Sequence, residues 1–125
     1  MTTPLLIYVA GPYRAPTAWR REEYIHRARV WGVHLARCGA YPVIPHSNTA
    51  HFDGEANDVL FLKGTLALMR RCDAVLMIDG WRQSIGATEE RAEAMRLGMP
   101  VRDVAGVDPD DEETLVNTHE WISDL

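Results

Sequence analysis

A length of 125 residues fits a single domain that is large enough for a real hydrophobic core. The composition, 46% hydrophobic and 25% charged, is that of an ordinary globular protein and excludes a disordered chain. A net charge of -5 argues against a broad surface for nucleic-acid polymers, but it leaves room for a local basic pocket that holds one phosphate.

Cysteine usage and apolar runs indicate the compartment. Cys38 and Cys72 each follow an apolar helical pattern, and no CxxC spacing indicates zinc, so we expect buried free thiols in a reducing environment. The first residues carry no basic leader, and no run approaches the length of a membrane span. We therefore expect a cytoplasmic protein without a membrane partner.

The first predicted strand, Leu5–Ala10, is apolar throughout, as a central parallel strand would be. A short loop follows at its carboxyl end, consisting of Gly11, Pro12, Tyr13 and Arg14. Such a loop can hold a phosphate or carboxylate, although it is also an ordinary turn. A long helix is predicted next, from Thr17 to Cys38, with an apolar stripe formed by Ile25, Ala28, Gly32, Leu35 and Ala36. Its arginines, Arg20 and Arg27 among them, are interpreted as surface charge.

The second predicted strand, Ala40–Ile44, contains Pro42, which favours an edge position. The irregular stretch 45–58 follows it and is rich in hydrogen-bonding side chains, namely His46, Ser47, Asn48, His51, Asp53, Glu55 and Asp58. Three interpretations are open: a metal site at His46, His51 and Asp53, a loop that covers a substrate, or a plain surface loop. We favour the substrate-covering loop and expect no bound metal.

Further helices are predicted over Val59–Arg71, with Val59, Leu62, Leu66 and Met69 facing inward, and over Asp110–Ser123; a fourth strand is predicted at Val101–Val104. The alternation of strands and helices predicts an α/β fold: a doubly wound parallel sheet of four to five strands with helices on both faces, Rossmann-like or flavodoxin-like. No GxGxxG follows the first strand and no P-loop lysine is present, so the sequence predicts neither a dinucleotide cofactor nor any other.

The segment from Asp73 to Pro100 carries the strongest signal. A buried strand, Ala74–Ile78, leads through Asp79 and Gly80 to a polar crest at 81–84, and a helix then runs from Gly86 to Gly98. On one face of this helix lie Ala87, Glu90, Ala94 and Leu97, so one carboxylate shares an otherwise apolar face. Either Glu90 belongs to a ligand site at the carboxyl edge of the sheet, or it lies at the margin of the stripe and reaches water.

Three stretches, IYVAGPY, VIPHSNT and CDAVLMIDGWRQSIGATEE with a following AxxxGxP, resemble the nucleoside 2-deoxyribosyltransferase superfamily. The likeness covers residues 5 to 104. It is closest to a branch of small proteins, frequent in phages, with a DGWxxSxGAxxE block, and to the deoxynucleoside 5′-monophosphate N-glycosidases.

The resemblance implies that Glu90 is the nucleophile that attacks the anomeric carbon, with Gly86 as the family's glycine four residues earlier and Tyr8 as the tyrosine that orients the carboxylate. It implies a phosphate site at Ser84, where an aspartate in the transferases would repel a phosphate, and in the loop of Gly11, Pro12, Tyr13 and Arg14. Ser84 could equally serve only as the helix cap.

The family usually places an aspartate that contacts the sugar 3′-hydroxyl where this chain has Thr65, a weaker acceptor. Asp79 either holds the base or ends the strand, and Trp81 either stacks on a base or covers a neighbour's pocket. The loop residues His46 and Asn48 are further candidates for substrate contact. Relatives complete the pocket with a neighbour's C-terminal segment, which points to a homo-oligomer, with Asn117 and Trp121 as candidates.

The resemblance thus implies cleavage of the N-glycosidic bond of a (deoxy)nucleoside 5′-monophosphate through a covalent glycosyl-glutamate. The alternatives are a nucleoside 2-deoxyribosyltransferase that exchanges bases and a nucleotide-binding protein with weak turnover, which Thr65 favours. The partner in each case is a small nucleotide or nucleoside.

Overall fold

Four short strands form one parallel sheet in the computed structural model, which describes residues 2–125. The strands are β1 (Leu6–Ala10), β2 (Tyr41–Val43), β3 (Ala74–Met77) and β4 (Val101–Asp103), and their order across the sheet is β2-β1-β3-β4. All three strand pairs are parallel. The sheet confirms the expected doubly wound α/β fold. The edge position predicted from Pro42 is also confirmed, because β2 pairs only with β1.

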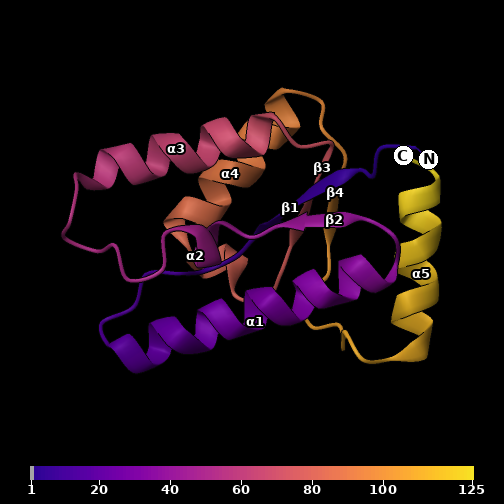
Figure 1. Cartoon of the computed structure of the whole chain (residues 1–125), viewed down its shortest axis with the longest axis horizontal. Helices are drawn as coiled ribbons and strands as arrows, with labels where there is room; N and C mark the ends of the chain where they lie inside the picture. Colours follow the sequence, from indigo (N-terminus) through magenta and orange to yellow (C-terminus); the bar gives the residue numbers. More distant parts are fainter. Residues whose placement is uncertain (1) are drawn as a thin grey trace.

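Helices cover both faces of this sheet (Figure 1). They are α1 (Ala18–Arg37), the short α2 (Pro45–Asn48), α3 (Asp58–Arg70), α4 (Ile85–Arg96) and α5 (Glu112–Ser123), together with a 3₁₀ turn, η1 (Trp81–Gln83). One core layer joins α1 and α5 to the sheet, and a second layer joins α3 and α4 to its other face.

The pleat of β1 assigns its side chains to these two layers. Ile7 and Val9 point into the core beneath α1, whereas Tyr8 and Ala10 point into the core beneath α3 and α4. All four side chains are fully buried, which explains why the sequence of this strand is a continuous apolar run. The hydroxyl of Tyr8 is buried with them. Such a hydroxyl needs a hydrogen-bond partner, and α4 provides it.

Three residues predicted to face the core are exposed instead: Ala36, Val59 and Leu97. Val59 lies in the first turn of α3, which projects beyond the ends of the strands (Figure 1), and Leu97 is the C-cap of α4, one residue past its last turn. The stripe of α1 is completed by two residues that the prediction left out, Trp31 and His34.

The two cysteines are free, as predicted; Cys38 is buried and Cys72 half-buried. No helix within residues 2–125 combines the length and the apolar character needed to cross a membrane.

Candidate functional site

A cavity of about 950 Å³ opens where β1 and β3 end. Its walls are the loop after β1, the first half of α1, the segment from α2 to α3, and the first turns of α4. The chain leaves β1 for β2 on one side and later adds β3 on the other, so the cavity lies at the topological switch point of the sheet, where ligands bind in open α/β folds. Its volume lies within the range of small-molecule sites.

At the floor of this cavity, the phenol of Tyr8 donates a hydrogen bond to the carboxylate of Glu90. Glu90 lies in the second turn of α4, on the buried face that also carries Ala87 and Ala94, and is only 7% exposed. The pair therefore joins β1 to α4 across 82 positions of sequence. Glu90 belongs to the cavity and not to the solvated margin of the helix.

Burial raises the pKa of Glu90 to about 7, even though the hydrogen bond from Tyr8 lowers it. The neighbouring charge of Glu89 raises the pKa slightly further. Burial and the charge of Glu90 together raise the pKa of Tyr8 well above its usual range, so Tyr8 stays protonated and acts as a donor. The result is a poorly hydrated carboxylate, about half ionised near neutral pH and fixed in direction by a phenol.

Thr65 lines the same cavity from α3. Its hydroxyl donates to the Leu62 carbonyl of its own helix at 3.0 Å. The one proton of the Thr65 hydroxyl is therefore already donated to a protein group, and the sugar contact stays a prediction.

Ser84 forms the N-cap of α4 and also lines the cavity. Its hydroxyl accepts a hydrogen bond from the backbone N–H of Ala87 at 3.1 Å, so Ser84 does cap the helix. A serine hydroxyl that accepts one bond still has a proton to donate, so capping does not exclude anion binding. Gly86 lines the cavity beside it and faces open space, where a Cβ would meet no atom within 4 Å.

The loop after β1 is held close to the sheet. A Cβ on Gly11 would lie 2.5 Å from the Cγ1 atom of Ile78, so no larger residue fits without a shift in the core. From α2, the Nε2 atom of His46 lies 3.2 Å from the carbonyl oxygens of both Gly11 and Pro12 and donates to them. Burial lowers the pKa of His46, so its ring is neutral, and its Nδ1 atom is buried without a partner. His46 thus orients the loop that walls the cavity.

The segment after α2 is attached to the same loop through Tyr13. The Tyr13 phenol donates to Asp53 at 2.6 Å and accepts from the backbone N–H of His51 at 3.3 Å. The ring of His51 pairs with Glu22 instead of turning toward His46. No group of three residues in the described part of the chain could hold a metal ion. Part of this segment, including Phe52, Asp53 and Asp58, lines the large cavity, and its role as a substrate-covering loop stays a prediction.

Three predicted site residues lie outside the cavity: Asn48, Asp79 and Trp81. Asn48 is exposed at the end of α2. The carboxylate of Asp79 accepts a hydrogen bond from the backbone N–H of Gly106. Asp79 therefore holds the turn after β4 and does not point into the cavity, where a base would bind.

Trp81 is buried in the core layer of α3 and α4 instead of facing a base or a neighbour's pocket. The guanidinium carbons of Arg82 and Arg91 lie 4.5 Å and 5.1 Å from its ring. Trp121, the candidate for completing a neighbour's pocket, packs against the core of its own chain. Trp81 was misplaced because spacing along a chain does not show which face of a layer a large ring enters, whereas the role of the half-buried Trp121 in a neighbour's pocket stays a prediction.

The sequence-based prediction missed several residues of the cavity wall. Arg20, Tyr24 and Arg27 face it from α1, and the segment before and within α3 adds Phe52 and Phe61. The three α1 residues recur at i, i+4 and i+7, which places them on one helix face, so a signal was present in the spacing. In the sequence alone, this pattern does not differ from ordinary surface charge.

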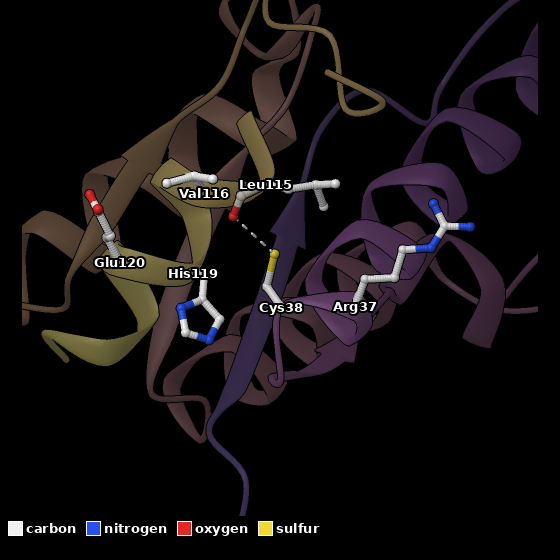
Figure 2. A pocket seen from close by; sticks show the side chains of 6 residues that line it. All are labelled: Arg37, Cys38, Leu115, Val116, His119 and Glu120. Carbon is white, nitrogen blue, oxygen red and sulfur yellow. Dashed lines mark hydrogen bonds between the residues drawn. The ribbon is translucent and has the colours of Figure 1, made fainter. Parts of the chain in front are cut away.

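A second, smaller cavity of about 390 Å³ lies between the C-terminal end of α1 and α5 (Figure 2). It is lined by Arg37, Cys38, Leu115, Val116, His119 and Glu120. The thiol of Cys38 donates to the Leu115 carbonyl at 3.6 Å, and burial raises the pKa of that thiol. Cys38 precedes β2, so this cavity lies away from the carboxyl edge of the sheet and is not the candidate site.

The sequence model of one protein family, described as a domain of unknown function (DUF4406), matches residues 5–103. No curated protein matches the chain at a significant level. The family match extends from β1 through β4 and includes both Tyr8 and Glu90, while α5 lies beyond it. Since the match covers well over half of the chain, the protein belongs to the DUF4406 family.

Proposed function

We propose that this protein cleaves the N-glycosidic bond of a (deoxy)nucleoside 5′-monophosphate, with Glu90 as the nucleophile. The observation that carries the proposal is the buried pair of Tyr8 and Glu90 on the floor of a cavity at the β1/β3 edge. A structural acid would be expected to pair with a cation, whereas Glu90 is held by a neutral phenol and faces a cavity. The resemblance of these residues to the deoxyribosyltransferase superfamily supports the same role.

In the proposed reaction, a carboxylate oxygen of Glu90 attacks the anomeric carbon as the bond from that carbon to the base nitrogen breaks. The base leaves with the bonding electron pair and takes a proton from water in the open cavity. Water then attacks the anomeric carbon from the other side, loses a proton to solvent and releases the Glu90 carboxylate. Two displacements give overall retention of configuration. Tyr8 keeps the attacking oxygen in place and remains protonated throughout.

The phosphate side of the substrate is assigned to the first turn of α4 and the loop after β1. The unpaired backbone N–H groups at a helix start favour an anion, and Ser84 and Gly86 line the cavity there. The Gly11–Arg14 loop lines the same cavity. A cytoplasmic homo-oligomer that acts on a small nucleotide remains our expectation.

A second candidate is a nucleotide-binding protein with weak turnover. The observation that favours it is the hydroxyl of Thr65, which donates its proton to the Leu62 carbonyl. This hydroxyl is a weaker hydrogen-bond acceptor for a sugar hydroxyl than a free carboxylate would be. Under this candidate, nucleotides stabilise the protein against unfolding but no base is released.

The test is incubation with each deoxynucleoside 5′-monophosphate and chromatography of the free base. A second free base added to the same reaction separates hydrolysis from transfer, because transfer yields a new nucleotide. Glu90→Ala should abolish base release. Glu93→Gln, on the same helix but outside the cavity, is the matched control and should retain it. Base release by Glu90→Ala at the wild-type rate would refute the assignment.

A further inference from the structure

Arg27 brings a guanidinium into the cavity wall where the loop after β1 meets the turn after β3. Gly80, in this turn, has a positive φ of 83°, and a Cβ there would lie 3.0 Å from the Cγ atom of Pro12 and 3.5 Å from the Nη1 atom of Arg27. The side chain of Arg27 is therefore packed at the switch point of the sheet, beside the loop and the turn that flank Ser84.

The guanidinium of Arg27 is only partly satisfied by the protein. Its Nη1 atom donates to the Asp79 carbonyl at 3.3 Å, and its central carbon lies 5.4 Å from the ring centroid of Tyr24. Among residues 2–125, no carboxylate forms an ion pair with it. A half-buried cation with several free N–H donors and no counter-charge favours an anion in the adjoining cavity.

The other two arginines of the cavity wall differ from Arg27 in that both are exposed and both form an ion pair with a carboxylate. The side chain of Arg14 is 71% exposed and pairs with Asp58 at 3.4 Å. Arg20 is 55% exposed and pairs with Glu23 at 3.4 Å. Exposed pairs of this kind add little binding energy, because solvent screens them and their side chains are mobile.

We infer that Arg27, from α1, binds the 5′-phosphate of the ligand and sets the preference for nucleoside monophosphates over nucleosides. The inference rests on the proposed function for the identity of the ligand. Stacking on Tyr24 fixes the plane of the guanidinium, and its free edge can then hold two phosphate oxygens in a bidentate arrangement. The start of α4 supplies further N–H donors in the same cavity.

The first experiment is independent of catalysis and uses inorganic phosphate as the probe. Thermal unfolding is followed as phosphate replaces chloride at constant ionic strength, so that general screening stays fixed. The Tm of the wild type should rise with phosphate, and the rise should be lost in Arg27→Gln. Arg29→Gln, an exposed residue of the same helix outside both cavities, should behave as the wild type. An equal rise in Arg27→Gln and the wild type overturns the inference.

The second experiment compares KM for a deoxynucleoside monophosphate with KM for the matching deoxynucleoside. Arg27→Gln should raise KM for the monophosphate about 10- to 100-fold and leave KM for the nucleoside unchanged, because charged hydrogen bonds to the phosphate are lost. Arg27→Lys retains the positive charge but cannot form two parallel hydrogen bonds, so its KM for the monophosphate should lie between those of the wild type and Arg27→Gln. It also serves as the test protein if Arg27→Gln does not fold.

These outcomes separate the two proposals. Phosphate binding that depends on Arg27, without base release from any nucleotide, supports the inference and refutes the proposed reaction. Base release by Arg27→Gln with a wild-type KM for monophosphates refutes the inference and leaves the reaction standing.

Discussion

The large and the small cavity each contain a buried acidic group, Glu90 in one and Cys38 in the other. Both groups are nearly inaccessible, and burial raises the pKa of both. Their partners differ: Glu90 accepts a hydrogen bond from Tyr8, whereas Cys38 donates one to the Leu115 carbonyl. The hydrogen bond from Tyr8 lowers the pKa of Glu90 against the effect of burial, whereas burial raises the pKa of the Cys38 thiol with no donor to oppose it.

The comparison shows that burial alone does not make a reactive group. A hydrogen-bond donor opposes the effect of burial on the pKa of Glu90, and the position on the sheet decides what the group can contact. Both conditions hold at Glu90, which faces the switch point. Neither holds at Cys38, which precedes an edge strand. Four variants test this contrast.

Glu90→Gln should have the largest effect, lowering base release about 10⁴-fold because the nucleophile is lost. It should also make stability less dependent on pH. Because the pKa of Glu90 is raised to about 7, the folded state keeps a proton that the unfolded state loses above pH 4.5, so wild-type stability falls as pH rises from 4.5 through 7 and then levels off. The loss amounts to about 3 kcal/mol.

Urea denaturation of both proteins at pH 5 and pH 9 measures this term. The amide that replaces the carboxyl group never ionises, so the variant should be the more stable protein at pH 9. Equal pH dependence in the two proteins would show that Glu90 is not the buried titrating group.

Tyr8→Phe comes next. Loss of the donor should raise the pKa of Glu90 further, because the hydrogen bond from Tyr8 lowers it in the wild type. The pH–rate profile, which should rise through about pH 7 in the wild type as Glu90 ionises, should then rise at higher pH. Base release at pH 7 should fall about 10- to 100-fold. An unshifted profile would mean that Tyr8 has only a packing role.

Ser84→Asp separates the capping role from the anion role. Aspartate is as good an N-cap as serine, so α4 should be retained, with a change in the free energy of unfolding below about 0.5 kcal/mol. The new negative charge should raise KM for a nucleoside monophosphate about 10-fold and affect KM for the nucleoside much less. Equal changes in KM for the monophosphate and the nucleoside would show that Ser84 only caps α4 and does not contact the phosphate.

Cys38→Ala should have the smallest effect and serves as the reference for the small cavity. Loss of a buried sulfur should lower the free energy of unfolding by about 1 kcal/mol, measured by urea denaturation. Base release and its pH profile should be unchanged, since Cys38 lies outside the large cavity. A loss of activity out of proportion to the loss of stability would contradict the contrast between the two cavities.

The sheet and the Glu90 helix could be predicted from the sequence because local patterns determine them. The apolar runs of β1 and β3, Pro42 on the edge strand, and Ser84 at the start of α4 each act over a few residues. Glu90 could be identified in the same way, because its position on an otherwise apolar helix face is also a local pattern.

The rest of the site depends on contacts between distant segments, which spacing does not reveal. Trp81 begins the polar crest and Asp79 lies two residues before it, but the Trp81 ring turns into the core and the Asp79 carboxylate binds the backbone of Gly106. Arg27 looked like surface charge because its neighbours in space, Gly80 and Pro12, come from other elements. The relation of α1 to the edge of the sheet is a property of the packed fold.

The two halves of the candidate site are attached to opposite layers of the molecule. Tyr8 and Glu90 belong to the layer of α3 and α4, whereas Arg27 and Tyr24 project from α1 on the other side of the sheet. In the proposed function, substitutions at Arg27 and Tyr24 of α1 would alter which anion is accepted while Glu90 keeps its surroundings. The choice of anion and the attacking carboxylate of the proposed function would then belong to separate layers of one fold.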